Sequence, residues 1–172
     1  MRRFLSLWFL AFFCLVARGS AQAQSTLEKI DKTGTLIIGT RSGSPPFAYV
    51  NKNNEWVGFA IDVVERAILP VLNKKLNKQV KLEKKESAPQ TRIPLLTSNA
   101  VDLIAETMTD TQSRRESVDF SLTYFVTGAQ FLVKKGSPIK GLQTVANRRV
   151  AAQQGSTNAK IIRERVPTAK AS

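Results

Sequence analysis

The sequence predicts an α/β fold in which parallel strands alternate with helices. Three observations support this prediction. Short apolar runs typical of buried strands recur along the chain, segments with apolar residues at helical spacing lie between them, and turns rich in Gly and Pro separate the two kinds of segment. This alternation is typical of parallel sheets covered by helices.

The first 23 residues are expected to be a cleaved secretory signal peptide and not part of the fold. Met1–Arg3 is basic, Phe4–Ala17 is almost wholly apolar, and Ala21–Ala23 offers a small-residue cleavage site. The alternative is an uncleaved membrane anchor, but an apolar run of about 14 residues is shorter than the roughly 20 that span a bilayer. Cleavage after Ala23 removes Cys14, the only cysteine.

A strand and a hairpin are expected first in the mature chain. Leu36–Gly39 is an apolar run of strand type, and the prolines of Gly43–Pro46 predict a loop after it. Phe47–Val50 and Trp56–Phe59 flank the polar segment Asn51–Glu55 and are predicted to pair as a hairpin.

Helices and strands alternate after the hairpin. Apolar residues from Ile61 to Leu76 recur at helical spacing, and Pro70 is expected to kink that helix. The later elements predicted in chain order are a strand at 80–83, a helix at 92–98, a strand at 101–105, a helical turn at 112–116, strands at 128–134 and 149–152, and a helix at 157–165. No strand is expected after this last helix.

Composition limits the classes of function. The formal net charge of +13 suits nucleic acid, an anionic membrane surface or an acidic ligand. The signal peptide argues against nucleic acid, and no aromatic residues alternate with the basic stretch at 74–85, which we interpret as a solvated face. The chain has no histidine, and its one cysteine is lost on cleavage, which excludes Cys/His metal sites and His-based triads.

Catalysis has little support in the sequence. No phosphate-binding P-loop is present, and no two acidic residues are placed as an acid/base pair. A Ser–Lys pair remains open as an alternative. We therefore expect a protein that is not an enzyme and that has neither a cofactor nor a metal.

A ligand site is predicted at the end of a buried strand. Thr107 and Thr109 follow the strand at 101–105, and Arg114 lies five residues beyond Thr109. In open α/β sheets, ligands collect outside the carboxyl ends of the strands. The guanidinium of Arg114 can hold both oxygens of a carboxylate, and Thr109 can add a donor. The alternative is a capped turn with a surface arginine.

In their order and spacing, these segments resemble family 3 of the bacterial extracellular solute-binding proteins, which serve polar amino-acid importers. The residues that carry the resemblance are 35–40, 46–47, 58–62, 101–109 with Arg114, 118–121 with Tyr124, and 154–157. The resemblance implies a type II periplasmic-binding-protein fold, in which two α/β lobes joined by hinge strands close on a ligand. Lobe one is expected at residues 24–124, largely complete, and an incomplete lobe two at 125–172.

The resemblance also implies roles for single residues. Arg114 would hold the α-carboxylate of the ligand, with Thr107 and Thr109 in contact, and Phe47 would either wall the site or pack in the core. From lobe two, the turn formed by Gly155, Ser156 and Thr157 would present backbone donors at a helix start, a place that attracts anions. The alternative is that Ser156 is an ordinary N-cap.

The nearest resemblance is to glutamate/aspartate receptors. Arg41 follows the first strand, and Arg92 precedes the buried strand at 101–105, as arginines that hold the side-chain carboxylate do in those receptors. Ser44 stands where many relatives for basic ligands carry a stacking aromatic, which also favours an acidic ligand. The alternative is that Arg41 and Arg92 are surface salt-bridge partners.

Two features depart from the family pattern. Glu106 stands where the family usually has a small residue, and its carboxylate would either repel an anionic ligand or pair with Arg114. Family members also continue well past residue 172. The chain is therefore expected to be a fragment or a truncated product, and the alternative is a genuinely shortened protein.

The predicted function is the periplasmic receptor subunit of an amino-acid ABC importer. A monomer would capture an acidic amino acid, glutamate or aspartate, between its lobes and dock on the membrane permease. The alternatives are a periplasmic enzyme on the same fold, similar to the dehydratases found there, and the sensor module of a larger receptor.

Overall fold

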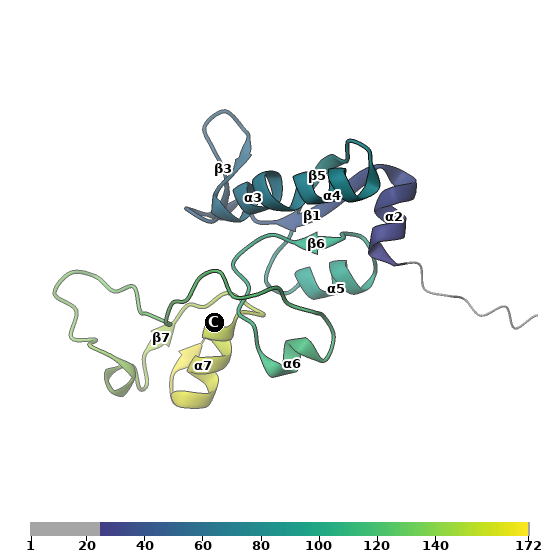
Figure 1. Cartoon of the computed structure of the whole chain (residues 1–172). Coiled ribbons are helices and arrows are strands. Elements are labelled where there is room, and N and C mark those ends of the chain that lie inside the picture. Colours follow the sequence, from purple (N-terminus) through teal and green to yellow (C-terminus); the bar gives the residue numbers. More distant parts are fainter. Residues whose placement is uncertain (1–24, 172) are drawn as a thin grey trace, which may run out of the picture.

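A three-stranded parallel sheet forms the centre of the fold in the computed structural model, which describes residues 25–171 (Figure 1). The strand order is β5-β1-β6, with β1 at Thr35–Thr40, β5 at Lys81–Glu86 and β6 at Leu103–Ile104. The register aligns Thr35 with Lys81 and Ile38 with Leu103. The expected parallel sheet is confirmed. The predicted signal peptide lies outside the described residues.

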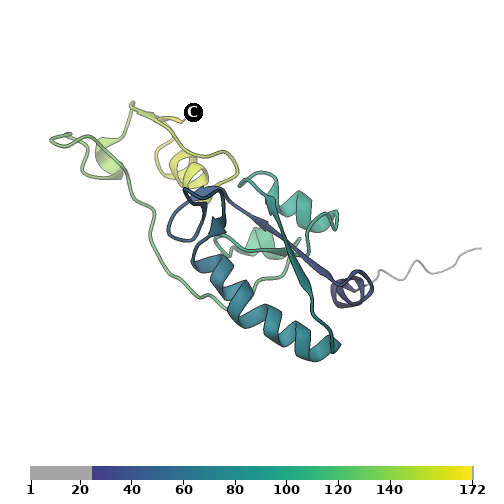
Figure 2. The same ribbon diagram turned by 90° about the horizontal axis from the view of Figure 1, so that it is seen from above.

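Helices lie on different sides of this sheet (Figure 2). The long helix that follows the hairpin is on one side of β1 and β5, and α5 (Arg92–Thr97) is on the other. The buried apolar cluster of this region comprises Ile30, Leu36, Ile38, Val64, Val80 and Ala105. Apolar side chains of α2 (Thr26–Thr33), β1 and the long helix therefore meet in one cluster, which holds these helices against the sheet.

The long helix consists of three consecutive pieces. They are α3 (Phe59–Val63), the π-helical segment η1 (Val64–Ile68) and α4 (Leu69–Leu76). A π-turn lies just before Pro70, the residue at which a kink was expected, and in it the Leu69 N–H donates to the Val64 carbonyl. Pro70 itself lies in the first turn of α4, a position where its missing N–H is tolerated.

Asp102 joins three segments at the amino end of β6. Its carboxylate accepts a hydrogen bond from the Ile37 N–H at 2.8 Å and pairs with Lys29 Nζ at 2.7 Å. Its own N–H donates to the Ile37 carbonyl at 2.7 Å. A single buried carboxylate therefore holds α2, β1 and the start of β6 together.

The predicted hairpin is confirmed, with one strand more than expected. Strands β2 (Gly43–Ser44), β3 (Ala48–Val50) and β4 (Trp56–Val57) form an antiparallel sheet in this order. The expectation that Gly43–Pro46 is only a loop was wrong for its first two residues. They pair with β3 because the prolines begin at position 45, just past the ladder.

The C-terminal part contains α6 (Gln112–Arg115), η2 (Leu142–Thr144), β7 (Arg149–Val150), α7 (Thr157–Arg165) and β8 (Lys170–Ala171). The strand predicted at 128–134 was wrong, because this segment forms no ladder with any described residue. The expectation that no strand follows α7 was also wrong, since β8 pairs in parallel with β7. Both errors concern pairing between distant segments, which local patterns do not encode.

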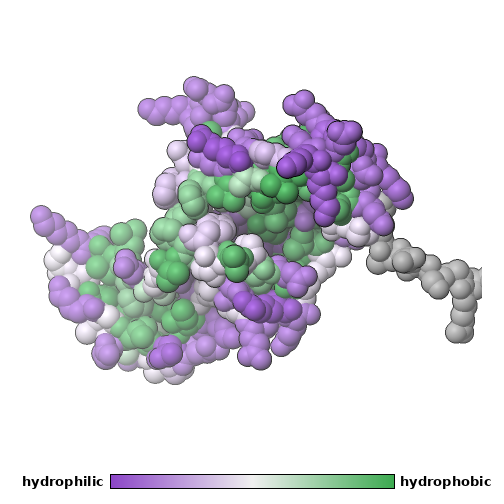
Figure 3. Space-filling view, viewed as in Figure 1, coloured by the Kyte–Doolittle hydropathy of each residue, from purple (hydrophilic) through white to green (hydrophobic). Residues whose placement is uncertain are grey.

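Large apolar side chains remain exposed around the unpaired segment. Leu122, Val126 and Leu132 are at least 85% exposed. Figure 3 shows apolar residues gathered over the lower left of the molecule, where Figure 1 labels β7 and α7. No helix within residues 25–171 is long and apolar enough to cross a membrane.

Candidate functional site

The candidate site lies beyond the carboxyl ends of β1 and β6. Arg41 directly follows β1, and Glu106 and Thr107 come just after β6. Because these strands are parallel neighbours, their carboxyl ends open at the same edge of the sheet. The Thr40 hydroxyl donates to the Ala105 carbonyl at 2.8 Å, which locks the two strand ends together.

Glu106 is a buried carboxylate at the centre of the site. The Ser87 hydroxyl donates to its Oε1 at 3.0 Å. Arg92 Nη1 lies 3.7 Å from Oε1, Arg41 Nε lies 3.6 Å from Oε2, and the Glu106 side chain is 0% exposed. The alternative that Glu106 pairs with Arg114 was wrong, because two other arginines surround it.

Arg92 is buried at the start of α5, with only 4% of its side chain exposed. Its Nη1 donates to the Thr107 carbonyl at 2.9 Å. The alternative that Arg92 is a salt-bridge partner is confirmed by its pair with Glu106, but its placement at the surface was wrong. Among the described residues, Arg92 Nε and Glu106 Oε2 are buried side-chain atoms without a hydrogen bond.

Arg41 connects the central sheet to the C-terminal part of the chain. Its side chain is 16% exposed, so the surface interpretation was wrong here too. Its Nη2 donates to the side-chain carbonyl Oε1 of Gln153 at 2.8 Å. The Nε side of this guanidinium thus lies near the buried carboxylate of Glu106, and its Nη2 binds the neutral amide of Gln153.

Arg114 lies on α6 and makes two hydrogen bonds through its guanidinium. Nη1 donates to the Thr109 carbonyl at 2.6 Å, and Nη2 donates to the Gly155 carbonyl at 3.1 Å. The N-cap Thr111 accepts from the Arg114 N–H at 3.4 Å and so orients the helical turn. The guanidinium keeps further N–H donors, since it carries five in a fixed planar arrangement.

The predicted turn at 155–157 meets the same edge of the sheet. The hydroxyls of Thr109 and Thr157 are hydrogen-bonded at 3.2 Å. Gly155 has φ +74°, and a Cβ on it would lie 2.9 Å from Gln90 backbone atoms, so the close approach requires glycine. Ser156 is the N-cap of α7, where its Oγ accepts from the Ala159 N–H at 3.1 Å.

Aromatic side chains lie beside the charged cluster. Phe47 is half-buried, with its ring centroid 4.7 Å from that of Phe125 and 6.4 Å from that of Phe59. The Tyr124 hydroxyl donates to the Glu106 carbonyl at 3.2 Å. Phe47 therefore packs in an aromatic group that borders the site.

Burial governs the electrostatics of the cluster. It raises the pKa of Glu106, and the contacts with Arg92, Ser87 and Arg41 oppose this shift. Burial also lowers the pKa of Arg92 and of Arg114, and Glu106 opposes both shifts. The three guanidiniums and one carboxylate leave a formal excess of two positive charges, which suits an anionic group.

Sequence analysis overlooked Ser87 and Gln153. Ser87 follows β5, and Gln153 follows the strand that begins at Arg149, so both stand just past strand ends like the residues that were found. The rule that ligands collect at carboxyl ends would have included Gln153, which directly follows the strand predicted at 149–152. It would have missed Ser87, because the strand predicted at 80–83 ends three residues before the observed end of β5 at Glu86.

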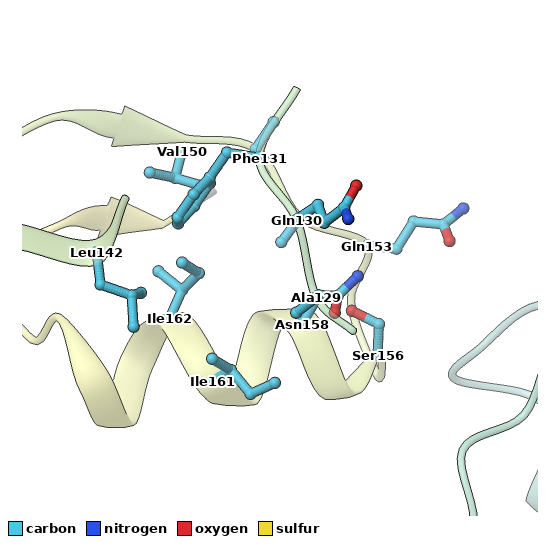
Figure 4. A pocket seen from close by; sticks show the side chains of 12 residues that line it. Ala129, Gln130, Phe131, Leu142, Val150, Gln153, Ser156, Asn158, Ile161 and Ile162 are labelled. Atoms are coloured by element: carbon cyan, nitrogen blue, oxygen red, sulfur yellow. The ribbon is translucent and has the colours of Figure 1, made fainter. Parts of the chain in front are cut away.

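A separate cavity of about 320 Å³ lies in the C-terminal part (Figure 4). Its lining includes Phe131, Val150, Ile161 and Ile162, and Gln153 and Ser156 are at one end of it. The mostly apolar walls do not suit a carboxylate. Within residues 25–171, no group of three or more His, Cys, Asp or Glu residues is arranged to hold a metal ion.

Similar proteins reveal the family. Residues 36–170 match the bacterial extracellular solute-binding proteins, family 3. The chain is 38% identical over 143 residues to the glutamate/aspartate import solute-binding protein of Salmonella typhimurium, covering 81% of this chain and 46% of that protein. It is 39% identical over 145 residues to the glutamine-binding protein of Geobacillus stearothermophilus, covering 83% and 54%. The chain spans about half the length of these relatives.

Solved structures show the fold. The ancestral amino acid-binding protein AncCDT-1, a precursor of cyclohexadienyl dehydratase, superposes with a TM-score of 0.73 at 35% identity, over 86% of this chain and 64% of that one. An ancestral arginine-binding protein bound to glutamine gives 0.71 at 36% identity, over 81% and 59%. The chain has the type II periplasmic-binding-protein fold that was predicted.

Proposed function

This chain belongs to the bacterial extracellular solute-binding proteins, family 3, and from that premise we propose that it captures an amino acid for an ABC importer. The observation that carries the proposal is the position of Arg114. Its guanidinium lies between the Thr109 and Gly155 carbonyls, at the edge of the sheet where ligands collect. Its remaining donors form the clamp for the α-carboxylate of the ligand.

Capture requires that two parts of the chain close on the ligand. Three hydrogen bonds join the part before residue 124 to the part after residue 149: Arg114 to Gly155, Thr109 to Thr157, and Arg41 to Gln153. Such contacts favour a closed arrangement in a two-lobe receptor. We propose the lobes at residues 24–124 and 125–172, with Ser156 and Thr157 at the mouth of the site.

The acidic amino acids are the first candidate ligands. The Salmonella relative is named for glutamate and aspartate, and the formal positive excess of the cluster suits a second carboxylate. In this case Arg41 and Arg92 would hold the side chain of the ligand, with Thr107 nearby.

Glutamine is the second candidate ligand. The relative from Geobacillus stearothermophilus is named for glutamine at a similar identity. A specific observation favours it, since Glu106 already contacts both Arg41 and Arg92. The choice between the two classes depends on this carboxylate.

Replacing Arg114 tests the proposal. Melting temperatures and calorimetric Kd values are measured for the chain from residue 24, with a panel of glutamate, aspartate, glutamine and arginine. Arg114→Ala is expected to lose about 2–5 kcal/mol of binding free energy, about thirtyfold or more in Kd, because a charge-paired donor set is removed.

Arg115→Ala is the matched control for Arg114→Ala. Arg115 is the next residue on α6, is 65% exposed and pairs with Asp110, so its removal is expected to leave the Kd within twofold. Equal affinity losses in both variants, or none in Arg114→Ala, would contradict the clamp.

We propose a periplasmic location and a membrane permease as the partner. The family of extracellular solute-binding proteins and the predicted signal peptide support this. Osmotic-shock fractionation of cells that express the chain tests it, since a protein retained with the cytoplasm would contradict it.

We propose binding without chemistry. The relatives above are named as binding proteins, although AncCDT-1 is described as a precursor of a dehydratase. A radiolabelled ligand recovered unchanged and in stoichiometric amount supports capture, whereas turnover would favour the enzyme.

A further inference from the structure

We propose that Glu106 occupies the subsite formed by the guanidiniums of Arg41 and Arg92, beside Arg114. It thereby selects amino acids with an uncharged side chain, above all a carboxamide. This inference rests on the proposed function and names its class of ligand. It makes Glu106 a specificity-determining residue, because the protein supplies the carboxylate that an acidic ligand would otherwise bring.

The first observation is where the carboxylate of Glu106 lies. Its carboxylate lies between Arg41 and Arg92, with nitrogen–oxygen distances of 3.6 and 3.7 Å, and its side chain is 0% exposed. A planar carboxylate between two guanidiniums is the arrangement that a bound side-chain carboxylate would adopt. Glu106 therefore fills that place from within the chain.

The second observation is how the guanidiniums of Arg41 and Arg92 are oriented. Arg92 is 4% exposed and donates to the Thr107 carbonyl, so its charge is directed into the protein. Arg41 turns Nε to Glu106 and holds the amide oxygen of Gln153 with Nη2 at 2.8 Å. The Nη2 donor of Arg41 is thus already held by a neutral acceptor, the carboxamide of Gln153.

The third observation is which of the three guanidiniums contact a carboxylate of the protein. Among the described residues, Arg114 contacts carbonyl oxygens and no carboxylate, whereas Arg41 and Arg92 each contact Glu106. The carboxylate of Glu106 therefore neutralises one of the two positive charges of Arg41 and Arg92, and the charge of Arg114 is left for the ligand carboxylate that every amino acid supplies from its backbone. A second ligand carboxylate beside Arg41 and Arg92 would meet the like charge of Glu106, which offsets part of the attraction of the two guanidiniums.

A purely structural ion pair is the competing explanation. Buried carboxylates that stabilise a fold usually have their oxygens satisfied by hydrogen bonds. Glu106 Oε2 makes none with any described residue, and its guanidinium contact is longer than the 2.7–2.9 Å of charge-assisted hydrogen bonds. Both explanations predict reduced stability when Glu106 is lost, but only the specificity role predicts a changed preference between ligands.

The decisive measurement is the ratio of Kd for glutamate to Kd for glutamine, two ligands that differ in little but side-chain charge. The wild type is expected to bind glutamine more tightly. Glu106→Gln, which keeps the shape, and Glu106→Gly, which opens the subsite, are expected to shift the ratio at least tenfold toward glutamate. Glu116→Gln removes the same charge from an exposed position on the end of α6 and is expected to leave the ratio within twofold.

A second measurement needs no amino acid. In Glu106→Gly the two guanidiniums face a space that a free carboxylate can fill, so acetate, compared with chloride at equal ionic strength, is expected to raise the melting temperature by about 2 °C or more. Where this variant does not fold in chloride, recovery of a cooperative melt in acetate is the readout. The wild type and Glu116→Gln serve as controls without such a space.

The outcomes separate the inference from the proposed function. An unchanged ligand ratio in both Glu106 variants, tighter binding of glutamate by the wild type, or no effect of acetate would overturn the role of Glu106. A chain that binds no amino acid contradicts the proposed function, and the acetate measurement then decides alone whether Glu106 occupies a carboxylate subsite.

Discussion

Removing both partners of the buried pair between Arg92 and Glu106 should destabilise the protein by less than the sum of the two single removals. Arg92→Met keeps a flexible apolar stem but deletes the guanidinium 3.7 Å from Glu106. It also leaves the Thr107 carbonyl without its 2.9 Å donor. The buried carboxylate would then retain only Arg41 and the Ser87 hydroxyl as partners.

The magnitude follows from the distance. Two unit charges 3.7 Å apart attract by about 4.5 kcal/mol at an effective dielectric constant of about 20, before desolvation is subtracted. Breaking a buried pair typically costs about 3–5 kcal/mol, because the remaining charge is uncompensated. We expect Arg92→Met to lose about 3 kcal/mol of unfolding free energy. In Arg92→Met/Glu106→Gln the loss should be at least about 1 kcal/mol smaller than the sum of the two single losses.

Urea unfolding of the chain from residue 24, followed by the fluorescence of Trp56, measures these losses. Arg66→Met is the matched control, since Arg66 is 82% exposed and its carboxylate partner Asp62 lies 3.9 Å away. It should change stability by less than about 0.5 kcal/mol. A loss in Arg92→Met as small as that of the control, or strictly additive losses in the double variant, would refute the reasoning.

Two further predictions concern Asp102 and the protonation of Glu106. Asp102→Ala removes the 2.8 Å acceptor of the Ile37 N–H and should lower the unfolding free energy by about 2–3 kcal/mol in urea; a loss below about 0.5 kcal/mol would contradict its structural role. Because burial raises the pKa of Glu106 above its ordinary 4.5, the folded state holds an extra proton in the window just above that value. The stability of the wild type relative to Glu106→Gln should therefore fall as pH rises from about 4.5 through the raised pKa; a pH-independent difference between about pH 4 and pH 8 would refute it.

Local signals predicted much of the fold. The helix α7 occupies Thr157–Arg165, as expected, and Ser156 is its N-cap. The hairpin between β3 and β4 follows from the polar turn between two apolar segments. The strand ends at β1 and β6 located the site because adjacent parallel strands bring their carboxyl ends to one edge.

Pairing between distant segments was the part that the sequence did not reveal. Residues 128–134 have strand-like composition, yet a strand exists only beside a partner, and none of the described residues provides one. The two-residue strands β2 and β8 exist because tertiary contacts align them with β3 and β7.

Contacts between distant charged residues of the site were likewise not revealed by the sequence, and they affect which ligand the site can bind. From the resemblance to glutamate/aspartate receptors we expected Arg41 and Arg92 to hold a second carboxylate of the ligand, in addition to the one at Arg114. A charge attracts a ligand only in so far as the protein has not already neutralised it, and Glu106 contacts two of the three guanidiniums from a buried position. The number of carboxylates that a ligand can bring thus depends on the pairs inside the protein, and among the described residues Arg114 is the one of these three guanidiniums that contacts no carboxylate.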